Sequence, residues 1–167
     1  MKFPRALLAF LLLLIIVSAC QKQDAEPIDE AAQLERRKAF RERLKVELGD
    51  TYDKTVPPAT KAQLVRGKIL YVQICSSCHG TNGKGTGETA KTLEIKPADL
   101  TDAEQATFFS EQARLYIIRK GINSTPMIGW ENVLSEEDVL AVFGYVRSLA
   151  FPQNIGERKD ETPETGN

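Results

Sequence analysis

The chain has few side chains that bind a metal through nitrogen or sulfur. Its 167 residues include one His, three Cys and two Met, so no site can take two imidazoles from one molecule. A structural zinc site needs four ligands, commonly Cys alone or Cys and His together. Three Cys and one His reach that number only if Cys20 takes part, and Cys20 ends an apolar N-terminal segment. The sequence therefore disfavours structural zinc.

An excess of basic charge and a long apolar run are also missing. Lys and Arg number 22 against 23 Asp and Glu, a formal net charge of −1. This balance does not indicate a nucleic-acid-binding protein. The N-terminal apolar run, from Ala6 to Val17, is shorter than the roughly 20 residues of a membrane-spanning helix. With Lys2 and Arg5 before it, the run has the pattern of an export signal.

The export signal ends in Val17-Ser18-Ala19-Cys20, which resembles the bacterial lipobox. The resemblance implies that residues 1–19 are a lipoprotein signal peptide and that Cys20 carries acyl chains. Several acyl chains hold a protein firmly on a membrane. The mature chain is then expected on the exported side of the bacterial cell envelope, and Gln21 implies the outer membrane in a Gram-negative cell. Ordinary signal peptidase cleavage and an uncleaved anchor are the alternatives.

Cys75-Ser76-Ser77-Cys78-His79 is the strongest functional signal in the chain. Cys-x-x-Cys-His is the attachment sequence of c-type haem. Two thiols one helical turn apart can add to the two vinyl groups of haem, and the imidazole of His79 supplies the proximal iron ligand. A thioredoxin-like redox pair is the main alternative, but the motif does not lie in a βαβ pattern. The motif predicts one covalent haem c, attached through Cys75 and Cys78.

The remaining sequence predicts a stalk, a haem domain and a tail. Residues 20–59 are expected to be a membrane-tethering stalk with a charged helix from Asp29 to Leu48. Residues 60–152 are expected to hold the haem domain, and the polar residues 153–167 to form a disordered tail. No long stretch of the haem domain alternates between polar and apolar residues, so an all-α fold is predicted. Helix starts are predicted at the capping residues Thr60, Thr101, Ser110 and Ser135.

The stalk helix carries only a narrow apolar stripe. Phe40, Leu44 and Leu48 are spaced i, i+4, i+8, and Lys and Arg residues crowd the same stretch. We interpret this segment as a solvated spacer helix whose basic charges are balanced by glutamates. Docking against anionic lipid head groups or against a partner is the alternative.

Met127 is the candidate for the second axial ligand of the iron. Haem iron is usually ligated by His or Met side chains. Because Met1 leaves with the signal peptide and His79 is the only His, Met127 is the only such side chain left for the second position. It follows Pro126 in a stretch that is not helical in pattern. A core-filling role, which is common for Met, is the alternative.

The order of these elements resembles a monohaem class I cytochrome c from about Gln63 to Ala150. The resemblance rests on a helix, CSSCH, a Gly-rich open loop, KPADL at 96–100, a further helix, the TPM sequence at 125–127 and a terminal helix. It implies a class I cytochrome c fold, in which small helices wrap around one haem and the first and last helices cross. The contacts of this crossing are expected at Gly67, Tyr71, Val142 and Tyr145.

The resemblance also implies three further contacts around the haem. The backbone carbonyl near Pro97 is expected to accept the N–H of His79 and so to orient the imidazole. Arg119 and Trp130 are expected to hydrogen-bond the haem propionates. The alternatives are that Arg119 caps the end of its own helix and that Trp130 is a core residue.

Ligation by His and Met fills both axial positions of a haem iron, so the sequence predicts an electron carrier and not an enzyme. The expected partners are exported redox proteins or membrane respiratory complexes, with no small-molecule substrate. Three alternatives are a haem c subunit of a larger respiratory oxidoreductase, a thiol-disulfide enzyme without haem, and a gas sensor in which Met127 is displaced.

Overall fold

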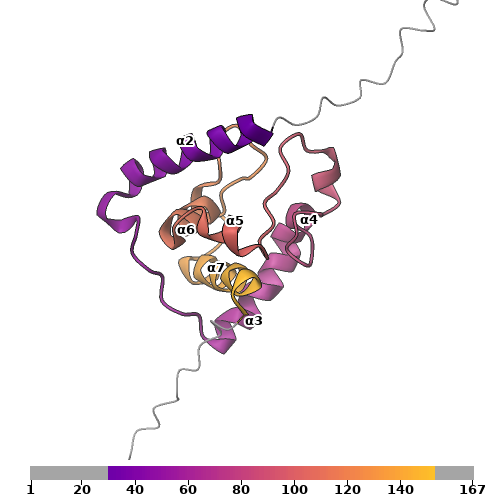
Figure 1. Cartoon of the computed structure of the whole chain (residues 1–167). Helices are drawn as coiled ribbons and strands as arrows, with labels where there is room; N and C mark the ends of the chain where they lie inside the picture. Colours follow the sequence, from indigo (N-terminus) through magenta and orange to yellow (C-terminus); the bar gives the residue numbers. More distant parts are fainter. Residues whose placement is uncertain (1–29, 153–167) are drawn as a thin grey trace, which may run out of the picture. The chain divides into compact units, whose positions relative to one another are not determined.

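The computed structural model describes residues 30–152, and this part of the chain contains helices and no strand (Figure 1). The predicted all-α fold is therefore confirmed for this range. The predicted signal peptide, Cys20 and the tail at 153–167 lie outside the described residues. None of the described helices is long and apolar enough to cross a membrane. The α-helices are α2 (Glu30–Leu48), α3 (Lys61–Leu70), α4 (Ser76–His79), α5 (Ala103–Thr107), α6 (Glu111–Lys120) and α7 (Glu136–Ala150).

Side-chain caps set most of the helix starts. Thr60 accepts a hydrogen bond from the backbone N–H of Gln63, whose side chain in turn accepts from the N–H of Thr60, a complete capping box. Ser110 and Ser135 cap α6 and α7 with one bond each, their hydroxyls accepting the backbone N–H of Ala113 and of Asp138. These three predicted starts are confirmed.

Helix α5 begins one residue later than predicted and ends at Thr107. Its cap is Asp102, whose carboxylate accepts the N–H of Gln105 at 2.8 Å. Thr101 lies before the helix in a turn with Asp99, whose carboxylate accepts both the hydroxyl of Thr101 at 2.6 Å and its backbone N–H at 2.8 Å. The helix therefore starts after Asp102.

The core lies where α3 crosses α7. Tyr71 and Phe143 are 0% and 1% exposed, and the rings of Tyr71 and Tyr145 lie 5.2 Å apart. A Cβ atom on Gly67 would lie 2.0 Å from the carbonyl oxygen of Ala141, so only glycine allows this approach of the two backbones. The predicted crossing contacts are confirmed. Other members of the core are Val56, Leu70, Leu115, Ile118, Val139, Val142 and Val146.

Buried Arg147 fixes the segment before α3 to the core. Its guanidinium donates to the carbonyls of Val56 at 2.8 Å and Pro57 at 3.1 Å, and to Glu111 at 3.1 Å. The other carboxylate oxygen of Glu111 accepts the N–H of Val56 at 2.7 Å. The chain between α2 and α3 is therefore held by α6 and α7.

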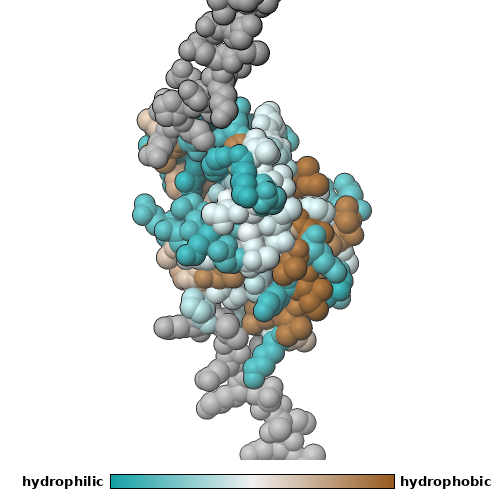
Figure 2. Space-filling view, turned by 90° about the vertical axis from the view of Figure 1, so that its right-hand side faces the viewer, coloured by the Kyte–Doolittle hydropathy of each residue, from teal (hydrophilic) through white to brown (hydrophobic). Residues whose placement is uncertain are grey.

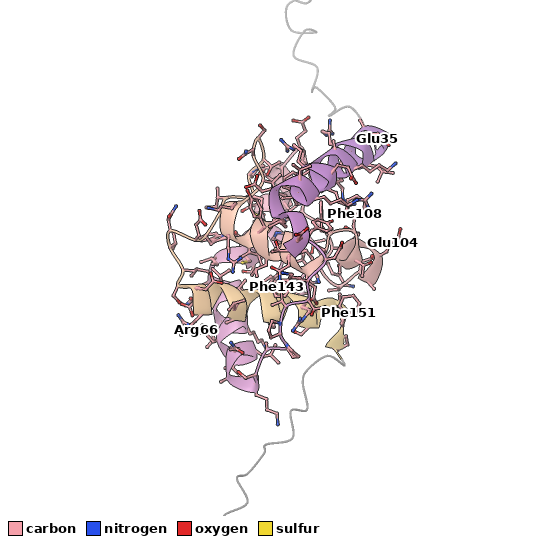
Figure 3. The ribbon with its side chains drawn as sticks, turned by 90° about the vertical axis from the view of Figure 1, so that its left-hand side faces the viewer. Glu35, Arg66, Glu104, Phe108, Phe143 and Phe151 are labelled. Atoms are coloured by element: carbon pink, nitrogen blue, oxygen red, sulfur yellow. The ribbon has the colours of Figure 1, made fainter. Side chains whose placement is uncertain are left out.

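Helix α2 packs against the segment of α5 and α6 through the stripe found in the sequence. Leu44 is 2% exposed, and the ring of Phe40 meets the edge of Phe109 at 5.8 Å. Phe108 lies beside α2 (Figure 3), with the guanidinium groups of Arg37 and Arg41 stacked over its ring at 4.4 and 4.6 Å. The interpretation as a solvated spacer is therefore wrong for this face. Phe108 and Phe109, which come from another part of the chain, cover the face of α2 that carries the narrow stripe.

Replacing Leu44 with alanine should lower the free energy of unfolding by about 2–5 kcal/mol, because it empties a buried site. The matched control on the same helix is Val46→Ala, since Val46 is 85% exposed. That change should cost less than about 0.5 kcal/mol. Urea denaturation of the two variants measures the difference. Equal effects would mean that α2 does not pack on the domain in solution.

Candidate functional site

The Cys-x-x-Cys-His motif lies where α3 widens into a π-helical turn. This turn covers Tyr71–Cys75 and leads directly into α4, which ends at His79. The hydroxyl of Ser76 donates to the carbonyl of Val72 at 2.7 Å within this region. Single π turns are frequent at functional sites. Apolar spacing in the sequence did not predict the turn, because it does not distinguish a π turn from an α turn.

Cys75 and Cys78 are free thiols and both are partly buried. Burial, and then the neighbouring Cys78, raises the pKa of Cys75 to about 11. Cys75 is therefore a neutral thiol at pH 7, whereas the reactive Cys of a thiol-disulfide enzyme has a lowered pKa. This difference disfavours the thioredoxin-like alternative. The structure describes no cluster of three or more His, Cys, Asp or Glu in residues 30–152 that could hold a metal ion.

His79 presents a partly buried, neutral imidazole. Burial lowers the pKa of His79, and the backbone of Ala98 partly opposes this shift. The bond from the imidazole to the carbonyl near Pro97 stays a prediction. The Nδ1 atom is buried without a partner at hydrogen-bond geometry. A neutral imidazole is the form that binds a metal.

The Gly-rich loop after His79 is closed against the motif. The N–H of Gly85 donates to the carbonyl of His79 at 2.9 Å, and the N–H of Gly87 donates to that of Cys78 at 3.1 Å. Gly85 has a φ of +70°, and a Cβ atom there would lie 2.4 Å from the carbonyl oxygen of Pro97. The expectation of an open loop is therefore wrong, because these bonds join residues 80–100 to the backbone that carries the motif.

Tyr71 fixes the backbone immediately after His79. Its side chain is fully buried, and its hydroxyl donates to the carbonyl of Gly80 at 2.7 Å. Burial also raises the pKa of this phenol. The sequence indicated only a packing role for Tyr71. A buried Tyr needs a hydrogen-bond partner, but the choice of Gly80 depends on the π turn between them.

Replacing Tyr71 with phenylalanine should cost about 1–3 kcal/mol of stability, because the Gly80 carbonyl loses its buried donor. The matched control is Tyr145→Phe in the same ring pair, since the hydroxyl of Tyr145 donates no hydrogen bond to a described residue. Thermal and urea unfolding of the two variants test this prediction. A larger loss for Tyr145→Phe would contradict it.

Met127 lies in a short loop whose base is closed. Gly121 and Ile128 form an isolated antiparallel bridge, and the N–H of Ile122 donates to the carbonyl of Met127 at 2.9 Å. The N–H of Met127 donates to the hydroxyl of Thr125 at 3.2 Å. Met127 is partly buried and belongs to neither hydrophobic cluster of the described residues. Hydrogen bonds therefore fix both the backbone N–H and the carbonyl of Met127. Because its side chain lies in neither cluster, a core-filling role is disfavoured.

Arg119 and Trp130 have partners within the protein. The guanidinium of Arg119 donates to both carboxylate oxygens of Glu136, at the start of α7. Trp130 is partly buried against the main core cluster, and its backbone N–H donates to Ile118 at 3.0 Å. Their contacts with haem propionates remain predictions.

Residues 64–150 match the cytochrome c family, and because this match covers more than half of the chain, the chain belongs to that family. Membership implies a covalently bound haem c and a role in haem-based electron transfer. The predicted all-α cytochrome c fold is confirmed by this match together with the helices described above.

Two solved structures are similar to the chain. A reducing HAO-like protein complex of Kuenenia stuttgartiensis is 23% identical with a TM-score of 0.47, covering 57% of this chain and 45% of that one. The c-type cytochrome KustC0563 is 29% identical with a TM-score of 0.42, covering 50% of this chain and 95% of that one. The chain thus spans less than half of the first of these proteins. No curated protein matches the chain.

Proposed function

We propose that the chain is an exported one-electron carrier with a single haem c, attached through Cys75 and Cys78 and ligated by His79 and Met127. The observation that carries the proposal is the partly buried, neutral His79 directly after two free thiols, inside the segment that matches the family. The hydrogen bonds that fix the backbone of Met127 support its assignment as the second ligand.

Bound haem c supplies an iron that alternates between its ferric and ferrous states. The residues of the chain hold that iron and limit what reaches it. Cys75 and Cys78 would hold haem c through two thioether bonds, each made by adding an S–H across a vinyl group, so that nothing is released. His79 and Met127 would supply the two protein ligands of the iron, which would leave no position for a substrate. A thioether ligand also raises the potential.

The proposal places the chain on the exported side of a bacterial membrane, with residues 1–19 removed and acyl chains on Cys20. One observation supports this location: the apolar segment that ends in Val17-Ser18-Ala19-Cys20. Labelling with a radioactive fatty acid tests the anchor. The full chain should take up the label and fractionate with membranes, and Cys20→Ser should do neither.

The attachment is tested by producing the chain with a working cytochrome maturation system. The denatured protein should stain for haem on a gel, and Cys75→Ser/Cys78→Ser should remove the stain because both thioether sulfurs are lost. A single haem per chain is checked by iron content. Colourless wild-type protein would contradict the proposed function.

Replacing Met127 with alanine should keep the haem stain but remove the weak red-end absorption band of sulfur-ligated ferric haem. The potential should fall by on the order of a few tenths of a volt, because axial ligation sets much of it. The ferrous variant should also bind carbon monoxide, which the wild type should not. The control in the same loop is Ile128→Ala, at a residue that is 59% exposed. An unchanged Met127→Ala spectrum would remove Met127 from the site.

A further inference from the structure

The outer face of α3 and of the π turn that continues it carries three exposed apolar side chains in line. Val65, Ile69 and Val72 are 62%, 48% and 46% exposed. Their spacing of i, i+4, i+7 makes them neighbours on one helical face, while Gly67 faces α7. Figure 2 views the side on which α4 lies in Figure 1 and shows hydrophobic residues gathered on part of it. Single exposed apolar residues are ordinary, but a continuous group indicates an interaction surface.

Positive charge borders this α3 stripe, which we define as Val65, Ile69 and Val72. Lys61 and Lys68 are exposed on the same helix and form no ion pair with a described residue. Residues 61–100 contain six Lys and Arg against three Asp and Glu, although the whole chain has a net charge of −1. Two lysines without an ion pair to a described residue therefore border the stripe, in a chain that is slightly acidic overall.

The α3 stripe ends next to the attachment motif. Val72 precedes Cys75 by three residues, and the π turn joins them without a break. If haem is attached as proposed above, a protein seated on the stripe lies about one helical turn from the haem-bearing cysteine. The position suits electron exchange, so the inference that follows rests on the proposed function.

We propose that the α3 stripe, with Lys61 and Lys68 at its border, is the docking surface for an acidic redox protein whose contact area has an apolar centre. The apolar residues would form the buried part of such an interface. Complementary charge raises the association rate and orients the two proteins. Small interfaces of this kind are usual for transient electron-transfer complexes.

Two other occupants fit the surface less well. In an antiparallel pair of two copies, the two Lys68 side chains would meet beside the centre of the stripe, and like charges at that position are repelled. A helix that lies on a lipid surface needs a broad apolar face. The larger apolar face of α3 and the π turn is already buried in the core with α7, where Leu70 and Tyr71 are 5% and 0% exposed.

The test compares two reductants of the soluble holoprotein that starts after Cys20. Reduced flavodoxin, a small acidic redox protein, must dock to transfer an electron, whereas hexaammineruthenium(II) needs no docking surface. Two double variants probe the surface: Ile69→Gln/Val72→Thr for its apolar part and Lys61→Gln/Lys68→Gln for its charge. The matched controls are Val133→Thr, at a residue that is 70% exposed, and Lys54→Gln.

Both double variants should slow reduction by flavodoxin, and the lysine variant by about tenfold at low ionic strength. That lysine effect should disappear in high salt, whereas the effect of the apolar variant should persist. Reduction by the ruthenium complex should change less than twofold in every variant, and the controls should behave as the wild type.

Flavodoxin rates that are equal in the wild type and both double variants would overturn the docking inference. Rapid reduction by the ruthenium complex would at the same time leave the proposed function standing. Dimers in sedimentation that dissociate in Ile69→Gln/Val72→Thr would assign the stripe to a second copy. Binding of the soluble holoprotein to vesicles of anionic phospholipid, lost in the same variant, would assign it to a membrane. Either result would replace the proposed partner.

Discussion

Replacing Gly67 with alanine should lower the free energy of unfolding by about 3 kcal/mol or more, because the new methyl group overlaps a backbone that cannot move aside. The added Cβ would lie 2.0 Å from the carbonyl oxygen and 2.5 Å from the carbonyl carbon of Ala141. Helix α7 would have to withdraw from α3 along the centre of the core. Tyr71 and Phe143, which are almost fully buried there, would lose contacts.

The sign of the Gly67→Ala effect separates packing from helix propensity. Within an isolated helix, alanine in place of glycine is stabilising by about 1 kcal/mol. Only the close approach of α7 reverses that sign. Urea denaturation of the holoprotein, followed by helical circular dichroism, measures the change. A variant more stable than the wild type would show that α3 and α7 do not cross as closely as described.

Replacing Arg147 with methionine should cost about 3–5 kcal/mol, because the change leaves buried polar groups without their partner. Arg147 is 7% exposed and donates to two backbone carbonyls and to Glu111. The segment at Val56 and Pro57, which connects α2 to α3, loses its hydrogen bonds to α7. Methionine keeps much of the side-chain volume, so the loss reports on the polar contacts.

The matched control for Arg147→Met is Arg66→Met. Arg66 also pairs with a carboxylate on another helix, Asp138, but its side chain is 53% exposed. Ion pairs near the surface contribute about 0–1 kcal/mol. Thermal unfolding of both variants provides the comparison. If Arg66→Met proved as costly as Arg147→Met, the burial of Arg147 would not be the reason for its importance.

The features that the sequence predicted correctly are those set by neighbouring residues. Thr60, Ser110 and Ser135 cap helices because each side chain reaches a backbone N–H three residues later. The crossing of α3 and α7 was inferred from small and aromatic residues in the order of a known family, and Gly67 meets Ala141 as that order implies.

The features that were missed depend on partners distant in the chain. Arg147 and Val56 are 91 residues apart, and nothing near either residue indicates that they meet. Helix α2 looked solvated because its stripe is narrow, and its burial depends on Phe108 and Phe109 arriving from another element. Within the site, the bond from Tyr71 to Gly80 requires a π turn that leaves no mark in the spacing of apolar residues.

The packing of α2 on the haem domain shortens any tether. The stalk inferred from sequence covered forty residues and included a solvated helix from Asp29 to Leu48, whereas in the structure α2, which begins at Glu30, packs on the domain. With acyl chains on Cys20, as proposed, only residues 21–29 separate the lipid from that helix. Fully extended, this length spans at most about 32 Å. The domain would then stay in a thin layer along the bilayer. It would meet its partners by diffusing in two dimensions, and those partners would have to lie at the same membrane surface.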